Sequence, residues 1–386
     1  MPTLKPLMTL QKPPPMNDLS PIKITRVDTF QVRLPLIKPM LMAGVVLHHA
    51  DNLLVRVETD NGQAGWGEAT AAPSHGGASL ADMAAVFRDT ISSHLIGQDA
   101  TRLSGLTTQL NQRLPLTRSA VAAVDLALYD LVGQCLGVPA SLLLGGLQRK
   151  TVPPLWLIGT SSVDGDLAEA QMRFEQGYRF FKLKLGVKKI DEDIASTLAL
   201  RERFGMSIRL CGDANMGYSP EQAMAYMVGV QTAAVEFIEQ PLHKDDLKGL
   251  RTLTKTGFMK IGLDESVVSV QDLLRYSPDG IAGVSLKTLK LGGLSGVMAA
   301  GHVADTLGLH INIAGKIAES SIASAALLQL SGVLPNVDWG VSPSHLYLAQ
   351  DIVRQPAQPR DGVYEISTAP GLGIDVDEAL VLRMVI

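Results

Sequence analysis

Phe180-Phe181-Lys182-Leu183-Lys184-Leu185-Gly186 is the stretch around which the rest of the chain can be understood. Apolar residues interleave with two lysines here, which is the period-two pattern of a strand. Side chains at positions i and i+2 point to the same face of a strand, so Lys182 and Lys184 share a face. Two ammonium groups on a buried strand are costly unless carboxylates or chemistry compensate for them. Carboxylates elsewhere in the chain are therefore expected to pair with these two lysines.

From Val152 onward, apolar strands alternate with polar, amphipathic helices. The predicted strands are Leu155–Gly159, Phe180–Leu185, Ile208–Asp213, Val235–Glu239, Lys260–Asp264, Gly283–Lys287, His310–Ala314 and Asn336–Trp339. Eight strands with intervening helices predict an α/β protein built on a (β/α)₈-type TIM barrel, here with seven clear helices. The alternative, an open doubly wound sheet, is disfavoured because no G-x-G-x-x-G motif follows a strand.

A smaller α+β lobe precedes the barrel. It begins with a strand from residue 22, continues through a loop at 37–49, and forms a hairpin around Asp60-Asn61-Gly62 before three helical stretches follow. We expect the end of the chain to return to this lobe. The predicted division is a loose N-terminal tail (1–21), an α+β capping domain (22–148), the catalytic barrel (149–350) and a C-terminal segment (351–386).

Composition places the chain among globular enzymes. Its 386 residues are 46% hydrophobic and 19% charged, and its net charge of −4 supplies no basic face for nucleic acid. The longest apolar stretch, residues 120–144, is interrupted by Asp125 and Asp130, so we expect no membrane span. Cys135 and Cys211 lie among apolar residues, as reduced thiols of a cytoplasmic protein do.

Carboxylates occupy the ends of three consecutive predicted strands, as Asp213, Glu239 and Asp264. The catalytic groups of such barrels gather at the carboxyl ends of the strands. Three carboxylates at one rim form an all-oxygen site suited to Mg²⁺. Lys184 and Lys287 end the flanking strands, so their amines should face each other across that ion.

This arrangement predicts proton transfer next to a carboxylate. A carbon acid at that position is too weak for a lysine to deprotonate unless the charge of the enolate is stabilised. A bound Mg²⁺ provides this stabilisation by coordinating the substrate carboxylate. Glu319 also follows a predicted strand, as either an acid or orienting group or a helix N-terminal charge.

Five motifs stand in order along the barrel sequence: Lys182-Leu183-Lys184, Asp213-Ala214-Asn215, Glu239-Gln240-Pro241, Asp264-Glu265-Ser266, and Lys287 with Gly292-Gly293. Together with the closing segment at 370–373, they resemble the enolase superfamily, in its muconate lactonizing enzyme subgroup. The resemblance covers nearly the whole chain. It implies a capped (β/α)₇β barrel that acts on a small carboxylate substrate and assembles as a homo-oligomer.

The resemblance also implies roles for single residues. Asp213, Glu239 and Asp264 correspond to ligands of Mg²⁺, for which Mn²⁺ is a substitute. Lys184 and Lys287 correspond to acid/base groups on opposite faces of the enolate. The remaining catalytic assignments are Lys182, which would assist Lys184 and the substrate carboxylate, and Glu319, which matches the acidic position after the seventh strand.

Residues beside these motifs have two interpretations each. Asn215 is either a neighbour that supports the metal ligands or a turn residue. Glu265 is either a partner for a lysine or a surface acid. His48, His49 and His75 lie in cap loops that should close over the barrel mouth, where they either contact substrate or are solvated.

Two further candidates concern substrate recognition. Met40 is expected to pack against the substrate or the barrel rim. Asp338, in Asp338-Trp339-Gly340, is the single acid where dipeptide epimerases carry an Asp-x-Asp pair at the eighth strand. The histidine that ends the seventh strand of mandelate racemase has no counterpart here, because His310 falls near the start of that strand. The Phe-Gly-Pro common in muconate cycloisomerases is absent as well.

The leading hypothesis is a Mg²⁺-dependent enolisation, as a muconate-type cycloisomerase. Racemisation or epimerisation of an N-acyl amino acid, dipeptide or proline derivative is the alternative, and o-succinylbenzoate synthesis uses the same groups. A catalytically silent binding barrel is the non-enzymatic alternative, although paired bases would have no purpose in one. Cap loops choose the substrate while the barrel supplies the shared step, so the sequence leaves these reactions open.

Overall fold

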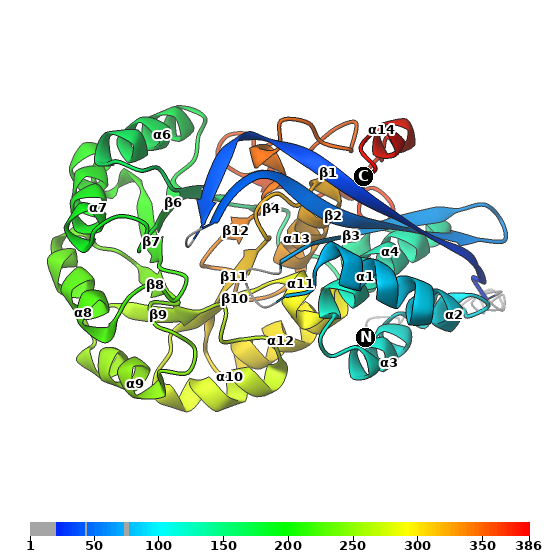
Figure 1. Cartoon of the computed structure of the whole chain (residues 1–386), viewed down its shortest axis with the longest axis horizontal. Coiled ribbons are helices and arrows are strands. Elements are labelled where there is room, and N and C mark those ends of the chain that lie inside the picture. Colours follow the sequence, from blue (N-terminus) through cyan, green and yellow to red (C-terminus); the bar gives the residue numbers. More distant parts are fainter. Residues whose placement is uncertain (1–20, 43–44, 73–76) are drawn as a thin grey trace, which may run out of the picture.

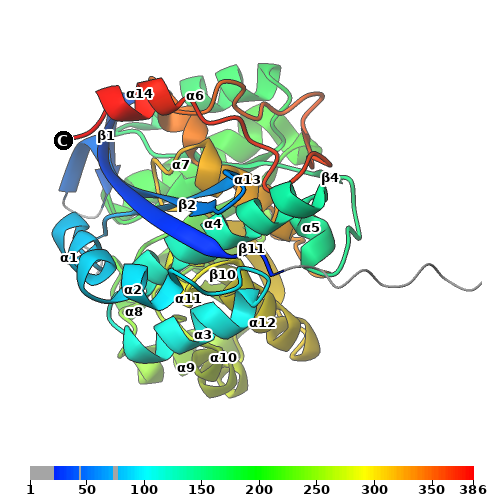
Figure 2. The same cartoon turned by 90° about the vertical axis from the view of Figure 1, so that its right-hand side faces the viewer.

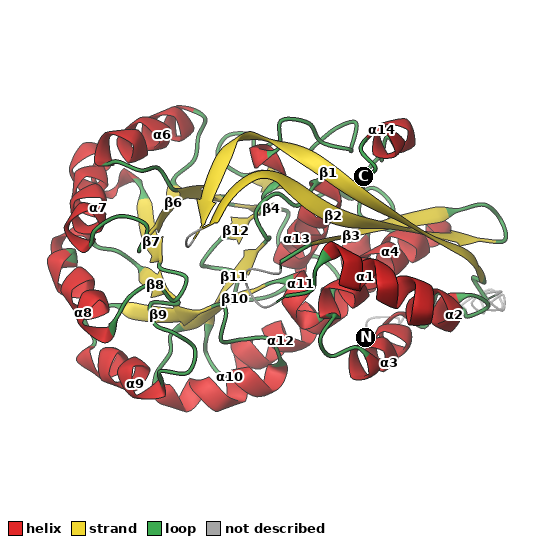
Figure 3. Cartoon of the chain, in the orientation of Figure 1, coloured by secondary structure: helices red, strands yellow, loops and turns green. Residues whose placement is uncertain are grey.

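The larger part of the molecule is a barrel of parallel strands inside an arc of helices (Figures 1 and 3). This computed structural model describes residues 21–42, 45–72 and 77–386. The barrel strands pair in chain order as β5 (Leu155–Ile158), β6 (Phe180–Lys184), β7 (Arg209–Asp213), β8 (Phe237–Glu239), β9 (Lys260–Leu263), β10 (Gly283–Leu286), β11 (His310–Ala314) and β12 (Val341–Ser342). The sheet nearly closes where the Val341 amide donates to the Pro153 carbonyl at 3.4 Å. The predicted barrel is confirmed.

Helices on the outside connect each strand to the next. They are α6 (Val163–Glu175), α7 (Ile190–Phe204), α8 (Pro220–Gly229), α9 (Leu247–Thr256), α10 (Val270–Tyr276), the short α11 (Thr288–Leu291) followed by α12 (Leu294–Thr306), and α13 (Ser321–Val333). Several begin at a serine whose hydroxyl accepts a hydrogen bond from an amide three residues later, as Ser162, Ser219 and Ser269 do. These caps satisfy amides that the first helical turn leaves without partners.

The predicted eighth strand at Asn336–Trp339 is wrong, because β12 begins at Val341. The indole ring of Trp339 stacks on Phe237 with ring centroids 3.7 Å apart. It fills space left by glycines: a Cβ at Gly283 would lie 2.5 Å from the Trp339 ring. Residues 336–339 therefore enter the barrel from its amino end, and β12 is the short segment after them.

The capping domain opens with a three-stranded antiparallel sheet of β1 (Ile24–Met42), β2 (Val45–Thr59) and β3 (Ala64–Thr70). The predicted loop at 37–49 is wrong for its described residues, because 37–42 belong to β1 and 45–49 to β2, which pair as far as Met42 and Val45. This long hairpin arches across the barrel (Figure 1). Near its end, the Lys38 Nζ contacts Glu169 Oε2 of α6 at 2.9 Å.

Helices follow the sheet: α1 (Leu80–Val86), α2 (Ser92–Leu95), α3 (Leu103–Arg113), α4 (Arg118–Leu136) and α5 (Ala140–Leu143). The helix α4 packs very closely on β3, since a Cβ at Gly67 would lie 1.8 Å from the Ala123 carbonyl oxygen. By length and composition alone α4 could cross a membrane, but 83% of its apolar window is buried inside the protein. That burial is typical of a core helix, so α4 gives no support for a membrane span.

The end of the chain contacts the capping sheet. After β12, the strand β13 (Tyr364–Glu365) pairs with β4 (Thr151–Val152), and α14 (Glu378–Arg383) lies beside β1 (Figure 2). The amide of the last residue, Ile386, donates to the Gln31 carbonyl at 3.0 Å. The C-terminal segment therefore contacts both the capping sheet, through α14 and Ile386, and the start of the barrel range, through β4; the division at 148/149 and 350/351 stays a proposal. The predicted tail lies outside the described residues except for Pro21.

Candidate active site

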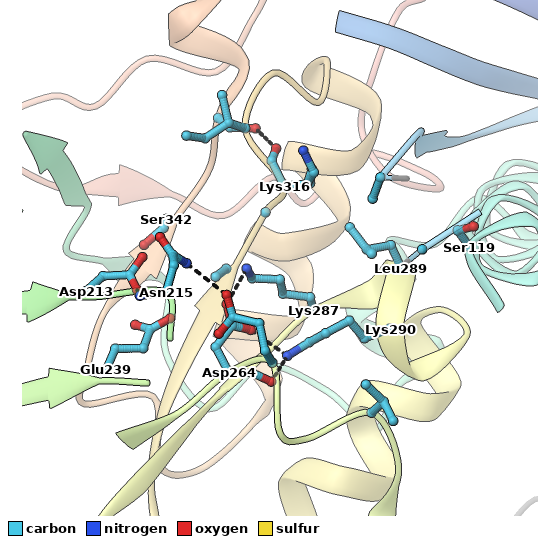
Figure 4. A pocket seen from close by; sticks show the side chains of 18 of the residues that line it. Ser119, Asp213, Asn215, Glu239, Asp264, Lys287, Leu289, Lys290, Lys316 and Ser342 are labelled. Carbon is cyan, nitrogen blue, oxygen red and sulfur yellow. Dashed lines mark hydrogen bonds and ion pairs between the residues drawn. The ribbon is translucent and has the colours of Figure 1, made fainter. Parts of the chain in front are cut away.

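A cavity of about 310 Å³ lies at the carboxyl ends of the barrel strands (Figure 4). The barrel contributes most of its charged lining. The capping domain closes one side with Ala72, Ala78, Pro115, Leu116, Arg118 and Ser119. Both domains therefore shape a single cavity, and the charged groups of the barrel face a mainly apolar cap that includes Arg118 and Ser119.

The two lysines of β6 point into this cavity, and both are at least 94% buried. The Lys182 Nζ contacts Glu239 and donates to Asn312 Oδ1 at 3.3 Å. The Lys184 Nζ lies 3.3 Å from Asp213 Oδ2. Carboxylates from the next strands thus compensate the two ammonium groups, as the cost of burying them requires.

The three acids end three neighbouring strands. Asp213 and Glu239 are direct partners in the register of β7 and β8, and Asp264 follows β9 immediately. Asp264 Oδ2 accepts a hydrogen bond from Lys287 Nζ at 2.6 Å, while its other oxygen contacts Lys290 on α11. Lys287 comes directly after β10. Carboxylates and amines are therefore interleaved at one rim.

Charge pairing sets the protonation of these groups. Although burial opposes it, the ammonium groups of Lys287 and Lys290 hold the pKa of Asp264 well below its usual range. Burial also acts against the charged form of Lys287, but Asp264, Glu265 and Glu239 raise its pKa overall. Lys287 is consequently an ammonium group in this state. Losing that charge requires a change at Asp264.

As they stand, no three His, Cys, Asp or Glu side chains in residues 21–42, 45–72 and 77–386 converge tightly enough to hold a metal ion. Asp213, Glu239 and Asp264 contact amines instead. The donor set nevertheless fits a hard divalent cation, since all three supply carboxylate oxygens at one rim. Burial raises the pKa of Glu239, and repulsion from Asp213 and Asp264 raises it further. A bound cation would relieve this repulsion.

Asn215 and Glu265 lie beside the acids. The Asn215 amide donates to Asp213 Oδ1 at 3.0 Å, and its side-chain nitrogen donates to Glu265 Oε1 at 2.9 Å. Asn215 has a φ of +41°, in the left-handed region that asparagine tolerates. Burial and repulsion from Asp264 and Asp213 raise the pKa of Glu265 to about 7. Asn215 therefore links the Asp213 carboxylate to a second acid.

Glu319 is fully buried on the segment between β11 and α13. Its Oε2 atom has no hydrogen-bond partner in the described part of the chain. Burial and repulsion from Glu68 raise the pKa of Glu319 to about 8. The side chain is thus protonated at neutral pH and able to donate a hydrogen bond.

Sequence reasoning missed three residues of this rim, Gln240, Lys290 and Lys316. The side chain of Gln240 accepts from the amides of Asp264 and Ser266 at 3.0 and 3.1 Å, so it fixes the start of the loop after β9. Lys316 lines the cavity three residues before Glu319. Gln240 stands inside a motif quoted above, and Lys316 lies three residues before Glu319, but a polar residue near a stronger candidate carries no signal of its own.

Most of the candidates for substrate recognition do not line the cavity among the described residues. Met40 is buried in the hydrophobic core, and His48 and His49 are exposed on β2. His75 lies outside the described residues. The Asp338 prediction is wrong: its carboxylate contacts His310, the first residue of β11, at the amino end of the barrel. The displaced start of β12 explains this error.

Comparisons with known proteins agree with this architecture. Residues 24–145 match the family described as mandelate racemase / muconate lactonizing enzyme, N-terminal domain, and residues 166–380 match enolase C-terminal domain-like proteins. Muconate cycloisomerase 1 of Rhodococcus opacus is 31% identical over 94% of this chain and 97% of its own length. L-Ala-D/L-Glu epimerase of Bacillus subtilis (strain 168) is 29% identical over 92% of this chain and 97% of its own length.

Solved structures give the same result. The muconate lactonizing enzyme of Pseudomonas fluorescens, complexed with muconolactone, superposes with a TM-score of 0.90 at 27% identity, over 94% of this chain and 99% of that chain. The matches span both domains and confirm the resemblance drawn from the motifs. The chain is therefore an isomerase of the enolase superfamily and belongs to the mandelate racemase/muconate lactonizing enzyme family, in its muconate lactonizing enzyme subgroup.

Proposed function

We propose that this protein catalyses a Mg²⁺-dependent enolisation of a small carboxylate, in the form of a muconate-type cycloisomerisation. The observation that carries the proposal is the order of groups around the rim. Amines from β6 and β10 flank three acids from β7, β8 and β9, and all line one cavity. The muconate and chloromuconate cycloisomerases among the relatives support the choice of reaction.

Asp213, Glu239 and Asp264 would hold the Mg²⁺, or Mn²⁺ in its place. When bound, this ion stabilises the negative charge that develops on the substrate carboxylate. The lysines that now contact these acids would then be released toward the substrate. Asn215 and Glu265 would support the acids through the hydrogen bonds that join them to Asp213.

We assign to Lys184 the transfer of the proton at the carbon next to the substrate carboxylate. It reaches the cavity from β6, whereas Lys287 reaches it from the other side of the acids. Lys182 would orient Lys184 and the carboxylate, because its Nζ is itself fixed between Glu239 and Asn312. Glu319 would act only as an orienting group, because it is fully buried and does not line the cavity, whereas Lys316 and Ile317 of the same segment do.

Racemisation or epimerisation of an amino-acid derivative is the second candidate, favoured by the similarity to L-Ala-D/L-Glu epimerase. In that reaction, Lys184 and Lys287 would exchange protons on opposite faces. A free α-ammonium group would need a carboxylate at the end of the eighth strand. That position holds Ser342, Pro343 and Ser344 instead, while Asp338 lies at the other end of the barrel.

The test is deuterium exchange in D₂O with Mg²⁺, followed by NMR, with muconate, chloromuconates, N-acyl amino acids and proline derivatives as substrates. We expect muconate to form a lactone that carries deuterium at the carbon next to its carboxylate. Lys184→Ala should abolish this reaction, while the exposed Lys248→Met serves as the matched control. Exchange of each enantiomer blocked separately by Lys184→Ala and Lys287→Ala would identify a racemase instead.

Failure of every substrate to exchange would contradict the proposed enolisation.

The proposal also includes a cytoplasmic homo-oligomer, as the family resemblance implies. Gel filtration with light scattering would check the assembly independently of the chemistry.

A further inference from the structure

We propose that Lys316 binds a second anionic group of the substrate, so that a dianionic substrate is held at both of its ends. This inference rests on the proposed function, which places the first carboxylate at the rim formed by Asp213, Glu239 and Asp264. It adds the residue that selects for the second charge.

Among the described residues, Lys316 is the buried lysine of this cavity that has no counterion; Arg118, the other cation of the lining without one, is partly exposed and donates to the Val268 carbonyl. The other lysines of the lining contact acids, as Lys182, Lys184, Lys287 and Lys290 do. The Nζ of Lys316 makes no ion pair or hydrogen bond with any residue that the structure describes, although the residue is only 9% exposed. A buried ammonium group without an anion is costly, so the site is suited to receive one.

The surroundings of Lys316 are positive. Burial and the neighbouring charges of Lys287 and Lys184 lower the pKa of Lys316 to about 8, and Glu319 acts in the opposite direction. Lys316 is still mainly protonated at neutral pH. An arriving carboxylate would therefore be attracted by more than one ammonium group.

The backbone around Lys316 is held firmly. The Ser344 hydroxyl donates to the Lys316 carbonyl at 2.6 Å and accepts from the Glu319 amide at 3.1 Å. Ala318 adopts a φ of +71°, and its carbonyl accepts from the Asn52 side chain of the capping domain at 3.1 Å. Such anchoring from both domains is what a preorganised binding group requires.

Lys316 and the three acids lie at different places around the barrel rim. The acids stand on β7, β8 and β9, whereas Lys316 follows β11, which lies farther round the barrel. Figure 4 shows Lys316 across the pocket from Asp213, Glu239 and Asp264, with Lys287 between. A substrate with one carboxylate at the acids and its reacting carbon between Lys184 and Lys287 would extend its far end toward Lys316.

The experiment is calorimetric titration of the Mg²⁺-loaded protein with non-reacting diacids and their monoamides. Succinate, glutarate and adipate cover three lengths, and each monoamide keeps the shape but loses one charge. We expect one diacid to bind about 10- to 100-fold more tightly than its monoamide, the usual strength of a charge-assisted hydrogen bond. Lys316→Met should remove this difference, and Lys316→Arg should restore most of it.

The controls separate the two claims. Lys248→Met, an exposed lysine on α9, should leave both affinities unchanged. Equal binding of diacid and monoamide to the wild type at all three lengths, or a preference that survives in Lys316→Met, would overturn the role of Lys316 alone. Absence of binding by both ligand classes would overturn the proposed enolisation as well. The wild-type comparison needs no variant, so it stands even if Lys316→Met folds poorly.

Discussion

Glu68 of the capping domain accepts hydrogen bonds from the backbone amide of Ser320, at 2.9 and 3.1 Å, where the barrel helix α13 begins. It also accepts from the Ser320 hydroxyl at 2.6 Å and from the Ala323 amide at 3.1 Å. A carboxylate of one domain thus caps a helix of the other. Because α13 follows the segment that carries Lys316 and Glu319, this contact joins the capping domain to the active-site rim.

Glu68→Ala should lower the free energy of unfolding by about 1–3 kcal/mol, because buried amides lose their acceptor. Urea denaturation measures the effect. Glu202→Ala, at an exposed acid on α7, is the matched control and should change stability by less than about 0.5 kcal/mol. If the two variants lose equal stability, Glu68 does not cap the helix.

The free energy of unfolding should fall as the pH rises, because Glu319 loses its proton. Burial and Glu68 raise its pKa from 4.5 to about 8, so the folded state binds the proton more tightly than the unfolded chain. The resulting stabilisation is complete below pH 4.5 and is lost as the pH rises through about 8. Urea midpoints at pH 5 and pH 8.5 test this.

Glu319→Gln, which imitates the protonated acid, should show a smaller decrease between the two pH values than the wild type. An identical decrease in both proteins would mean that Glu319 is already ionised when folded.

The barrel and its acids could be predicted from local patterns. Asp213 and Glu239 each end an apolar run, and the rule that barrel chemistry gathers at the carboxyl ends of strands places them together. The structure brings these acids to the cavity predicted for them. Their separate contacts with lysines depend on side-chain orientation, which no local pattern encodes.

The wrong predictions for residues 336–339 and 37–49 arise from contacts between residues that are distant in sequence. Trp339 is apolar and belongs to a strand-like stretch. In the structure its ring packs against Gly262 and Gly283 at the amino end of the barrel, so β12 begins only at Val341. The histidines and methionines of 37–49 favour a loop, yet pairing between β1 and β2 makes strands of 37–42 and 45–49. Gln240 could not be predicted because it bonds to amides distant in sequence, and Lys316 could not be predicted because only the folded chain places it in the cavity.

Gln240→Leu should weaken metal binding by about 10- to 100-fold, as loss of a supporting hydrogen bond to a ligand typically does. Its side-chain oxygen holds the Asp264 and Ser266 amides, so the variant frees the loop that carries Asp264. Calorimetric titration with Mn²⁺ gives the affinity. Gln171→Leu, on α6, is the control. Unchanged affinity in Gln240→Leu would show that Asp264 needs no such support.

Asp338→Asn should leave kcat/KM within about twofold of the wild type, because this acid contacts His310 at the amino end of the barrel. A half-exposed ion pair of this kind contributes about 0–1 kcal/mol to stability. Steady-state kinetics on the substrate found by exchange provides the check. A large loss of activity would mean that Asp338 belongs to the active site, which would contradict the observed start of β12.

The most direct test of the central claim is Mn²⁺ binding followed by electron paramagnetic resonance. The account predicts one saturable site per chain, weakened at least 100-fold by Asp213→Asn, Glu239→Gln or Asp264→Asn, since each removes a charged ligand. Asp338→Asn, at the other end of the barrel, should bind as the wild type does. Absence of a saturable site, or equal affinity in all four variants, would contradict a metal held in common by the three acids.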